Sequence, residues 1–229
     1  MRIRLDSRAR VRVVAAALLV AAATAQAATQ AQAQPTAQVQ AQAQRQAQDQ
    51  DLAQAPRPGM LTTADLPPDP LTWQGHASDQ PGDSFETRCL AGWYRPDVPE
   101  ENIWTADFFT SETAAAYERV YVLPTEAEAI ALADSARLHY AGCAGRMQAD
   151  YPHDVVTAQD HGTVDVEEGA TVGGVHEQEV PAWQGYRNVL YGVGRDGNTV
   201  AIVEWESNST QPDVPAFKET VRAAVNKLH

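Results

Sequence analysis

Two groups of histidine and carboxylate side chains are the clearest candidates for chemistry in this sequence. Imidazole and carboxylate together suit zinc and similar ions. The spacing fits no known ligand pattern, because a helical zinc motif needs a second histidine four residues after the first. We therefore favour solvated strand and turn residues, and keep a hydrolase or metal-dependent enzyme using His161, Asp165 and His176 as the weakest alternative. The two groups are His161 with Asp165 and Glu167, and His176 with Glu177 and Glu179.

Other catalytic signatures are missing from the sequence. It contains no G-x-S-x-G motif for a nucleophilic serine. Gly173-Gly174 and Gly192-x-Gly194 fall in expected strands and not at helix starts, so they do not form phosphate-binding loops. Glu167 and Glu168 are adjacent, so on a strand they point to opposite faces. We expect a non-enzymatic protein without a metal or a cofactor.

Aromatic side chains are the more promising candidates for binding. Indole and phenol rings can line a ligand groove and present a polar group at its rim. Packing in and around the core is the competing interpretation. The cleft candidates are Trp93, Trp104, Trp183, Tyr186 and Trp205.

The two cysteines of the chain are Cys89 and Cys143. Two cysteines in an exported chain most often form one disulfide. We therefore predict a Cys89–Cys143 bridge, which would tie the front of the domain to a long helix.

The N-terminal residues resemble an export signal. A basic segment precedes the apolar run Val13–Ala23, which is short for a membrane span, and Ala25-Gln26-Ala27 offers small residues for cleavage. We expect a signal peptide over 1–27, with an uncleaved anchor as the alternative, and then a soluble, secreted, extracellular protein. The basic residues are Arg2, Arg4, Arg8, Arg10 and Arg12.

The charge balance bears on the partners of the chain. The formal net charge is −13, and loss of the arginine-rich signal makes the remainder more acidic. An acidic surface repels phosphate backbones and anionic lipid. We expect no nucleic acid and no membrane partner after signal cleavage, and we expect a monomer.

Composition divides the rest of the chain. Residues 28–59 are rich in Ala and Gln and have very few large apolar side chains, so we predict a disordered linker there. The remaining 60–229 is long enough for one core. We expect a loop over Asp69–Asp83 and a short strand around Cys89.

Two helices stand out by apolar spacing. Thr125–Asp150 has a capping box at Thr125 and Glu128, and Gly142 and Gly145 weaken its last turns. Asp213–Leu228 begins with a capping aspartate. The expected buried stripes are Ala129, Leu132, Ala133, Ala136, Tyr140, Cys143 and Met147 in the first helix, and Phe217, Val221, Ala224, Val225 and Leu228 in the second.

Alternating segments predict strands over 104–110 and 116–123. Two more strands are expected within Val155–Val180, where 163–167 alternates, Glu168-Gly169 forms a turn and 171–176 continues. Asp196-Gly197 predicts a hairpin that pairs Gly194 with Thr199. Val189, Tyr191, Val193, Val200 and Ile202 should share one face of it, and Leu190, Gly192, Gly194, Ala201, Val203 and Trp205 the other. We predict an α+β domain in which an antiparallel sheet of about five to six strands is covered by two main helices.

The order of several segments resembles a known family. They are Met60-Leu-Thr-Thr-Ala-Asp-Leu-Pro-Pro, Cys89, Leu123-Pro-Thr-Glu-Ala-Glu-Ala with the later Cys143, the hairpin that starts at Asn188, and the terminal helix. Together they resemble the PknH-like extracellular sensor domain and its stand-alone secreted actinobacterial relatives. The resemblance implies an antiparallel sheet carrying helices and a cleft for an extracellular ligand.

The functional expectation is a secreted, non-enzymatic, sensor-like domain that binds a small molecule or a cell-wall ligand. An extracellular protein-interaction or inhibitor module is the second alternative, and a contiguous exposed apolar patch would favour it.

Overall fold

The computed structural model describes residues 57–82, 86–93, 95–181, 185–208 and 211–229. All of these belong to one compact unit, Gln46–His229. The expected signal peptide and residues 28–56 of the expected linker lie outside the described residues. Residues 57–59 contact the fold: Pro58 is buried, and Arg57 lies 5.1 Å from the ring centre of Trp104.

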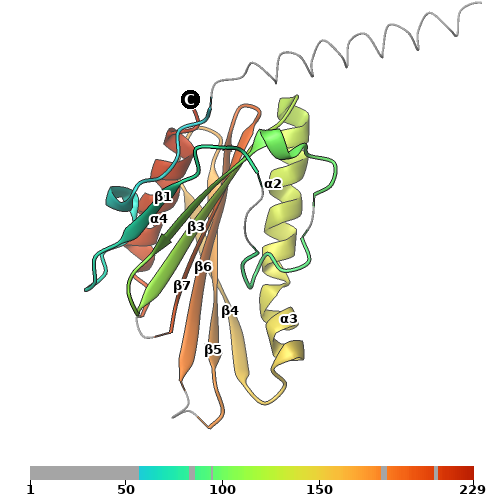
Figure 1. Ribbon diagram of the computed structural model, residues 1–229. Coiled ribbons are helices and arrows are strands. Elements are labelled where there is room, and N and C mark those ends of the chain that lie inside the picture. The colour runs from blue at the N-terminus through green and yellow to red at the C-terminus, as the bar shows by residue number, and fades with distance from the viewer. Residues whose placement is uncertain (1–56, 83–85, 94, 182–184, 209–210) are drawn as a thin grey trace, which may run out of the picture. The chain divides into compact units, whose positions relative to one another are not determined.

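The centre of the fold is one antiparallel sheet of seven strands in the order β1-β2-β3-β7-β6-β5-β4 (Figure 1). The α+β prediction is confirmed, but five to six strands was too few. The strands are β1 (Gln74–Ala77), β2 (Ile103–Phe109), β3 (Ala114–Val122), β4 (Val155–Val164), β5 (Ala170–Gln178), β6 (Tyr186–Asp196) and β7 (Thr199–Ser207).

The front of the chain differs most from prediction. β1 lies within the segment expected to be a loop, and Gln74–His76 are all exposed. Main-chain pairing with β2 holds this strand at the sheet edge, so it leaves no apolar alternation in the sequence. The strand expected around Cys89 is wrong, because residues 88–92 form turns.

Helices cover both faces of the sheet. α2 (Glu126–Ala141) and α3 (Cys143–Asp150) pack on one face, and α4 (Val214–Asn226) packs on the other (Figure 1). We call these the α2 face and the α4 face. Tyr121 and Ile202 are buried on the α2 face, and Val203 and Trp205 are buried on the α4 face.

The long helix begins where its cap predicts and is divided where glycine weakens it. The Thr125 hydroxyl accepts a hydrogen bond from the Glu128 amide, which caps α2. Gly142 separates α2 from α3, so Thr125–Asp150 is two helices and not one. Every residue of the expected stripe is nevertheless buried, because the apolar face continues across the break.

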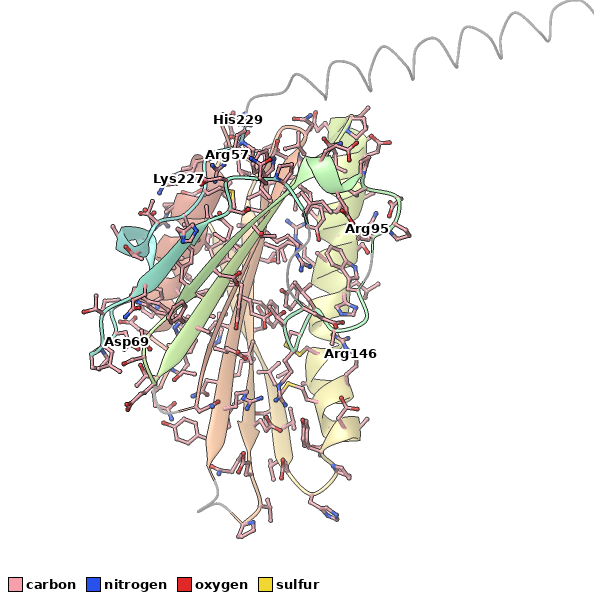
Figure 2. All side chains as sticks on the ribbon, viewed as in Figure 1. Arg57, Asp69, Arg95, Arg146, Lys227 and His229 are labelled. Carbon is pink, nitrogen blue, oxygen red and sulfur yellow. A yellow bond between two sulfur atoms is a disulfide. The ribbon has the colours of Figure 1, made fainter. Side chains whose placement is uncertain are left out.

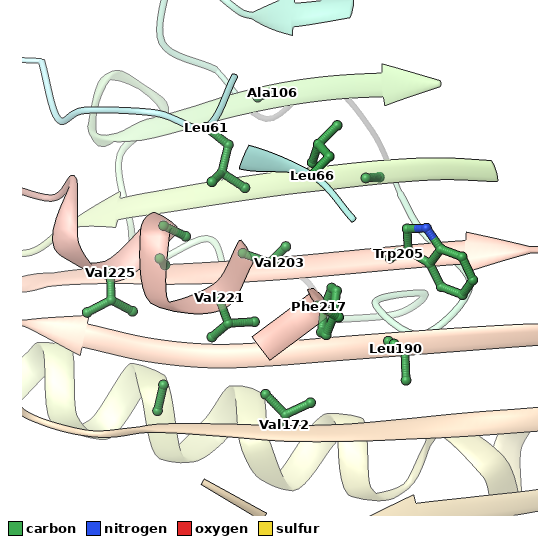
Figure 3. Packing of buried hydrophobic residues seen from close by; sticks show 14 of the residues in the cluster. Leu61, Leu66, Ala106, Val172, Leu190, Val203, Trp205, Phe217, Val221 and Val225 are labelled. Atoms are coloured by element: carbon green, nitrogen blue, oxygen red, sulfur yellow. The ribbon is translucent and has the colours of Figure 1, made fainter. Parts of the chain in front are cut away.

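The α4 face has a continuous apolar core (Figure 3). The Asp213 carboxylate caps α4 by accepting from the Ala216 amide, and all five residues of the predicted stripe are buried. Gly192 and Gly194 let the helix approach the sheet: a Cβ at Gly192 would lie 2.3 Å from Cγ2 of Val221. Leu61 and Leu66 extend this core from the N-terminal segment.

The β6–β7 hairpin has the predicted faces but not the predicted register. The turn residues are Gly197 and Asn198, so Gly194 pairs with Ala201 and not with Thr199. Moving the turn by one residue shifts the pairing by two positions. Because side chains alternate with a period of two, such a shift leaves every side chain on its original face.

The β4–β5 hairpin lies within Val155–Val180, where two strands were expected, but its first strand extends well before the alternating segment over 163–167. β4 starts at Val155 and ends at Val164, so the strand expected over 163–167 is the end of β4 followed by the turn. β4 is a largely exposed edge strand, which explains why its pattern is weak. A bulge lies at Asp160–Gly162. The Tyr191 side chain packs closely over the backbone of Gly173, since a Cβ there would lie 2.5 Å from the Tyr191 hydroxyl.

The Cys89–Cys143 disulfide is confirmed, with Cα atoms 5.2 Å apart. It links the irregular segment that precedes β2 to the first residue of α3. Arg146 reinforces this junction, because its guanidinium donates to the Cys89 carbonyl at 2.8 Å and to the His139 carbonyl at 2.9 Å (Figure 2).

Candidate functional site

The described members of the predicted aromatic cleft lie on different faces of the sheet. Trp93 lies on the α2 face, whereas Trp205 and the half-buried Trp104 pack with the α4-face core. Tyr186 begins β6, with its ring 6.0 Å from that of His176. Trp183 lies outside the described residues. The four described side chains therefore occupy opposite faces of the sheet and cannot line one groove.

The three residues of the metal-enzyme alternative are also separated. His176 on β5 pairs with Thr157 of β4, which is four residues from His161, or roughly 13 Å along a strand. Asp165 follows the end of β4. Among the residues that the structure describes, no group of three or more histidine, cysteine or carboxylate side chains could hold a metal ion.

A cavity of about 510 Å³ lies beside the start of α2. We call it the α2 cavity. One wall is the segment from Arg95 through the short helix η2 (Glu100–Asn102), and the other is the end of β3 with the first two turns of α2. Its lining residues are Arg95, Asp97, Val98, Pro99, Glu101, Asn102, Val122, Leu123, Pro124, Glu128 and Ala131.

The walls of the α2 cavity are fixed by hydrogen bonds and ring contacts. The Leu123 amide donates to the Asn198 carbonyl at 2.9 Å, and the Asn198 side chain donates back to the Leu123 carbonyl at 2.5 Å. On the other wall, the Trp93 indole donates to the Ser135 hydroxyl at 3.3 Å, and Arg95 lies 5.6 Å from the indole centre. Trp93 therefore contributes by supporting a lining residue.

Asn102 is the most informative lining residue. It is only 7 % exposed, and its backbone amide donates to the Pro99 carbonyl at 2.9 Å. Its side-chain amide makes no hydrogen bond to any part of the chain that the structure describes. The residue as a whole is buried, but its side-chain amide still reaches solvent. An amide left available at the wall of a hollow is suited to bind a ligand group.

The α2 cavity is lined by more acidic than basic side chains. Arg95 donates to both Asp97 oxygens, at 2.9 and 2.6 Å. This contact raises the pKa of Arg95 and lowers the pKa of Asp97, so both stay ionised. Glu101 and Glu128 form no ion pair with another described residue. Glu128 accepts only from the capping hydroxyl of Thr125, at 2.9 Å.

A second polar group lies deeper on the α2 face, at Glu204. Its Oε2 accepts from the Thr87 hydroxyl at 2.8 Å and from the Tyr140 hydroxyl at 2.9 Å. Burial raises the pKa of Glu204 to about 7. The space beside this carboxylate is too small to hold a water molecule, so we interpret the group as an anchor for the Thr87 segment.

Exposed apolar side chains are spread over several elements. They occur on β2, on α2 and around the connection from α3 to β4, and they are Phe109, Ile130, Leu138, Tyr151, Val155 and Val180. None of them lines the α2 cavity.

The sequence contained a weak signal for the α2 cavity. Pro99 and Pro124 mark the two segments that meet there, but only as breaks in regular structure. Nothing in the periodicity places the first segment against the start of α2.

No helix in the described part of the chain combines the length and the apolar character needed to span a membrane. The disulfide is compatible with an oxidising, extracellular setting. No protein family, no curated protein and no solved structure matches this chain.

Proposed function

We propose that this protein is a secreted, non-enzymatic domain that binds a small extracellular ligand in the α2 cavity, in the manner of a sensor-like module. The observation that carries the proposal is a hollow of about 510 Å³ with Asn102 in its wall, whose side-chain amide has no hydrogen-bond partner among the described residues. Small-molecule sites are typically hollows of about 300–1,000 Å³ that combine apolar walls with a few polar groups.

Preorganisation supports this assignment. Both walls are held by contacts that need no ligand, namely the Leu123–Asn198 hydrogen bonds and the Trp93–Ser135 hydrogen bond. A site whose walls are already ordered binds with a smaller entropic cost. The disulfide serves the same end, because it fixes the irregular segment that leads into the first wall.

A thermal-shift screen with a filled-cavity variant tests the proposal. Ala131 is an exposed residue of α2 that lines the cavity, so Ala131→Phe should fill it without disturbing the core. Ala141→Phe is the matched control, since Ala141 is also exposed and lies ten residues away, or about 15 Å along a helix. The library would contain cell-wall fragments and small metabolites.

We expect some compounds to raise the melting temperature of the wild type, and we expect this shift to be lost in Ala131→Phe. Ala141→Phe should respond as the wild type does. Compounds that stabilise all three proteins equally would bind elsewhere and contradict the assignment of the site. A library without any stabilising compound would contradict the function itself.

A further inference from the structure

We propose that the α2 cavity selects a small organic cation, namely a primary amine joined to an apolar body. This inference rests on the proposed function and specifies its ligand class. The structure supports it by three independent properties of the cavity wall: its unpaired charge, its apolar surface and the free amide of Asn102.

The first property is the charge that remains at the cavity once Arg95 and Asp97 have paired with each other. Arg95 and Asp97 face each other in a bidentate contact, so their opposite charges largely cancel at the distance of a ligand. Glu101 and Glu128 have no cationic partner among the described residues. Both residues are exposed, so two solvent-screened carboxylates from opposite walls remain available to an ammonium group.

The second property is the apolar part of the cavity wall. Val98 and Leu123 are buried side chains of the wall, and Pro99 and Pro124 add rings that offer no backbone N–H donor. Such a surface gains free energy when it covers the apolar part of a ligand. A small inorganic cation would leave this apolar surface exposed to water, so the wall favours an organic cation.

The third property is the side-chain amide of Asn102, which can hydrogen-bond a polar group of the ligand. Its amide offers both donors and an acceptor without adding charge, so it can bind a hydroxyl, a carbonyl or an amine of the ligand. An anionic ligand would need Arg95, which Asp97 already occupies. The acidic chain, with a formal net charge of −13, adds a long-range field that raises the local concentration of cations.

Isothermal titration with three matched compounds tests the inference. Phenethylamine, 2-phenylethanol and 3-phenylpropionate share an aromatic body and differ in charge. We expect the wild type to bind phenethylamine about ten-fold tighter than 2-phenylethanol, which is about the upper effect of two exposed ion pairs. It should bind 3-phenylpropionate more weakly than either.

The double variant Glu101→Gln with Glu128→Gln should lose this preference for the amine. Glutamine preserves the shape at both positions and still serves in the capping box of α2. The control is Glu100→Gln with Glu112→Gln, which removes the same charge from two exposed residues outside the cavity. The control should retain the full preference.

Three outcomes would overturn the inference: equal binding of the alcohol and the amine, a preference for the propionate, or no binding of the amine to the wild type. An unchanged preference in the Glu101→Gln and Glu128→Gln variant would also overturn it. The proposed function fails separately, since it requires only that some ligand of any charge loses its binding in Ala131→Phe.

Discussion

The two faces of the sheet are closed by different means. The α4 face is covered by one regular helix and the N-terminal segment, without a covalent link. The α2 face is covered by α2, α3 and an irregular segment over 86–102, and it contains the disulfide. The cavity lies on the second of these faces, where regular packing ends.

Close packing is the main device on the α4 face. A Cβ at Gly194 would lie 2.4 Å from Cγ2 of Val225, so the helix side chains pack directly against the glycine backbone of the sheet. The N-terminal segment is bound to the helix by polar contacts. The Thr220 hydroxyl donates to the Asp65 carbonyl at 2.6 Å, and Lys227 forms an ion pair with the Asp65 carboxylate.

On the α2 face, a few specific bonds hold the irregular segment in place. The irregular segment has no periodic apolar face to bury, so few side chains can hold it. The Cys89–Cys143 bridge, the Thr87–Glu204 hydrogen bond and the Arg146–Cys89 hydrogen bond hold it instead. A segment fixed at discrete points can leave a hollow between them, whereas a helix packed along its length fills the space.

Each face also contains one buried glutamate. Glu118 on β3 lies on the α4 face and pairs with Val203, and the neighbouring Glu204 on β7 lies on the α2 face and pairs with Tyr117. Among the described residues, the Glu118 carboxylate accepts a hydrogen bond only from the Leu61 amide, at 2.7 Å, whereas the Glu204 carboxylate accepts from two hydroxyl groups. The second hydrogen-bond donor to Glu204 is consistent with its smaller rise in pKa, to about 7 against about 8 for Glu118.

The largest effect should come from the covalent link of the α2 face. Replacing both cysteines, Cys89→Ala with Cys143→Ala, should lower the free energy of unfolding by about 2–5 kcal/mol. The bridge closes a loop with a sequence separation of 54 residues, whose ordering would then oppose folding. Urea denaturation measures the change, and reduction of the wild type is the control. Equal denaturation midpoints would show that the polar anchors hold the face without the bridge.

The next effect is a pH dependence on the α4 face. Burial raises the pKa of Glu118 to about 8 in the folded protein, above an unfolded value near 4.5. A raised pKa favours the protonated folded form, so this stabilisation is present below pH of about 4.5 and is lost as the pH rises toward about 8. Glu118→Gln keeps the acceptor for the Leu61 amide and has no such dependence.

Chemical denaturation at pH 5 and at pH 8 measures this difference. Relative to the wild type, Glu118→Gln should gain on the order of 3 kcal/mol between these two pH values. Glu204→Gln, as the comparison on the other face, should gain less and should level off near pH 7. A wild-type stability that falls no more steeply than that of Glu118→Gln would contradict the assignment of a neutral Glu118.

The contrast between the faces also explains what the sequence could predict. Periodic apolar spacing predicts the regular elements. The buried stripe of α4 and the faces of Val193 and Val203 are confirmed. The register of the hairpin was missed because Asp196-Gly197 and Gly197-Asn198 both satisfy a two-residue turn. The two choices bury the same side chains, so the apolar pattern cannot separate them.

The candidate site was less predictable because its position depends on irregular backbone. Trp93 was identified by its residue type, yet its role is to support Arg95 and not to line a groove. Asn102 has no sequence feature that marks it as buried. Only the path of the segment over 95–102 places this amide against the start of α2, and no periodic pattern encodes that path.

The smallest predicted effect tests the close packing of the α4 face. In Gly192→Ala the added methyl group would meet Val221 at 2.3 Å, so helix and sheet must separate. We expect a loss of about 1–3 kcal/mol in the free energy of unfolding, as for other overpacked cores. Gly145→Ala on α3 is the matched control: Gly145 is exposed with open space around its Cα, and alanine there should stabilise the helix by roughly 0.5–1 kcal/mol. If both variants shift stability in the same direction, close approach at Gly192 does not distinguish the α4 face, and the proposed division between packing and anchoring fails.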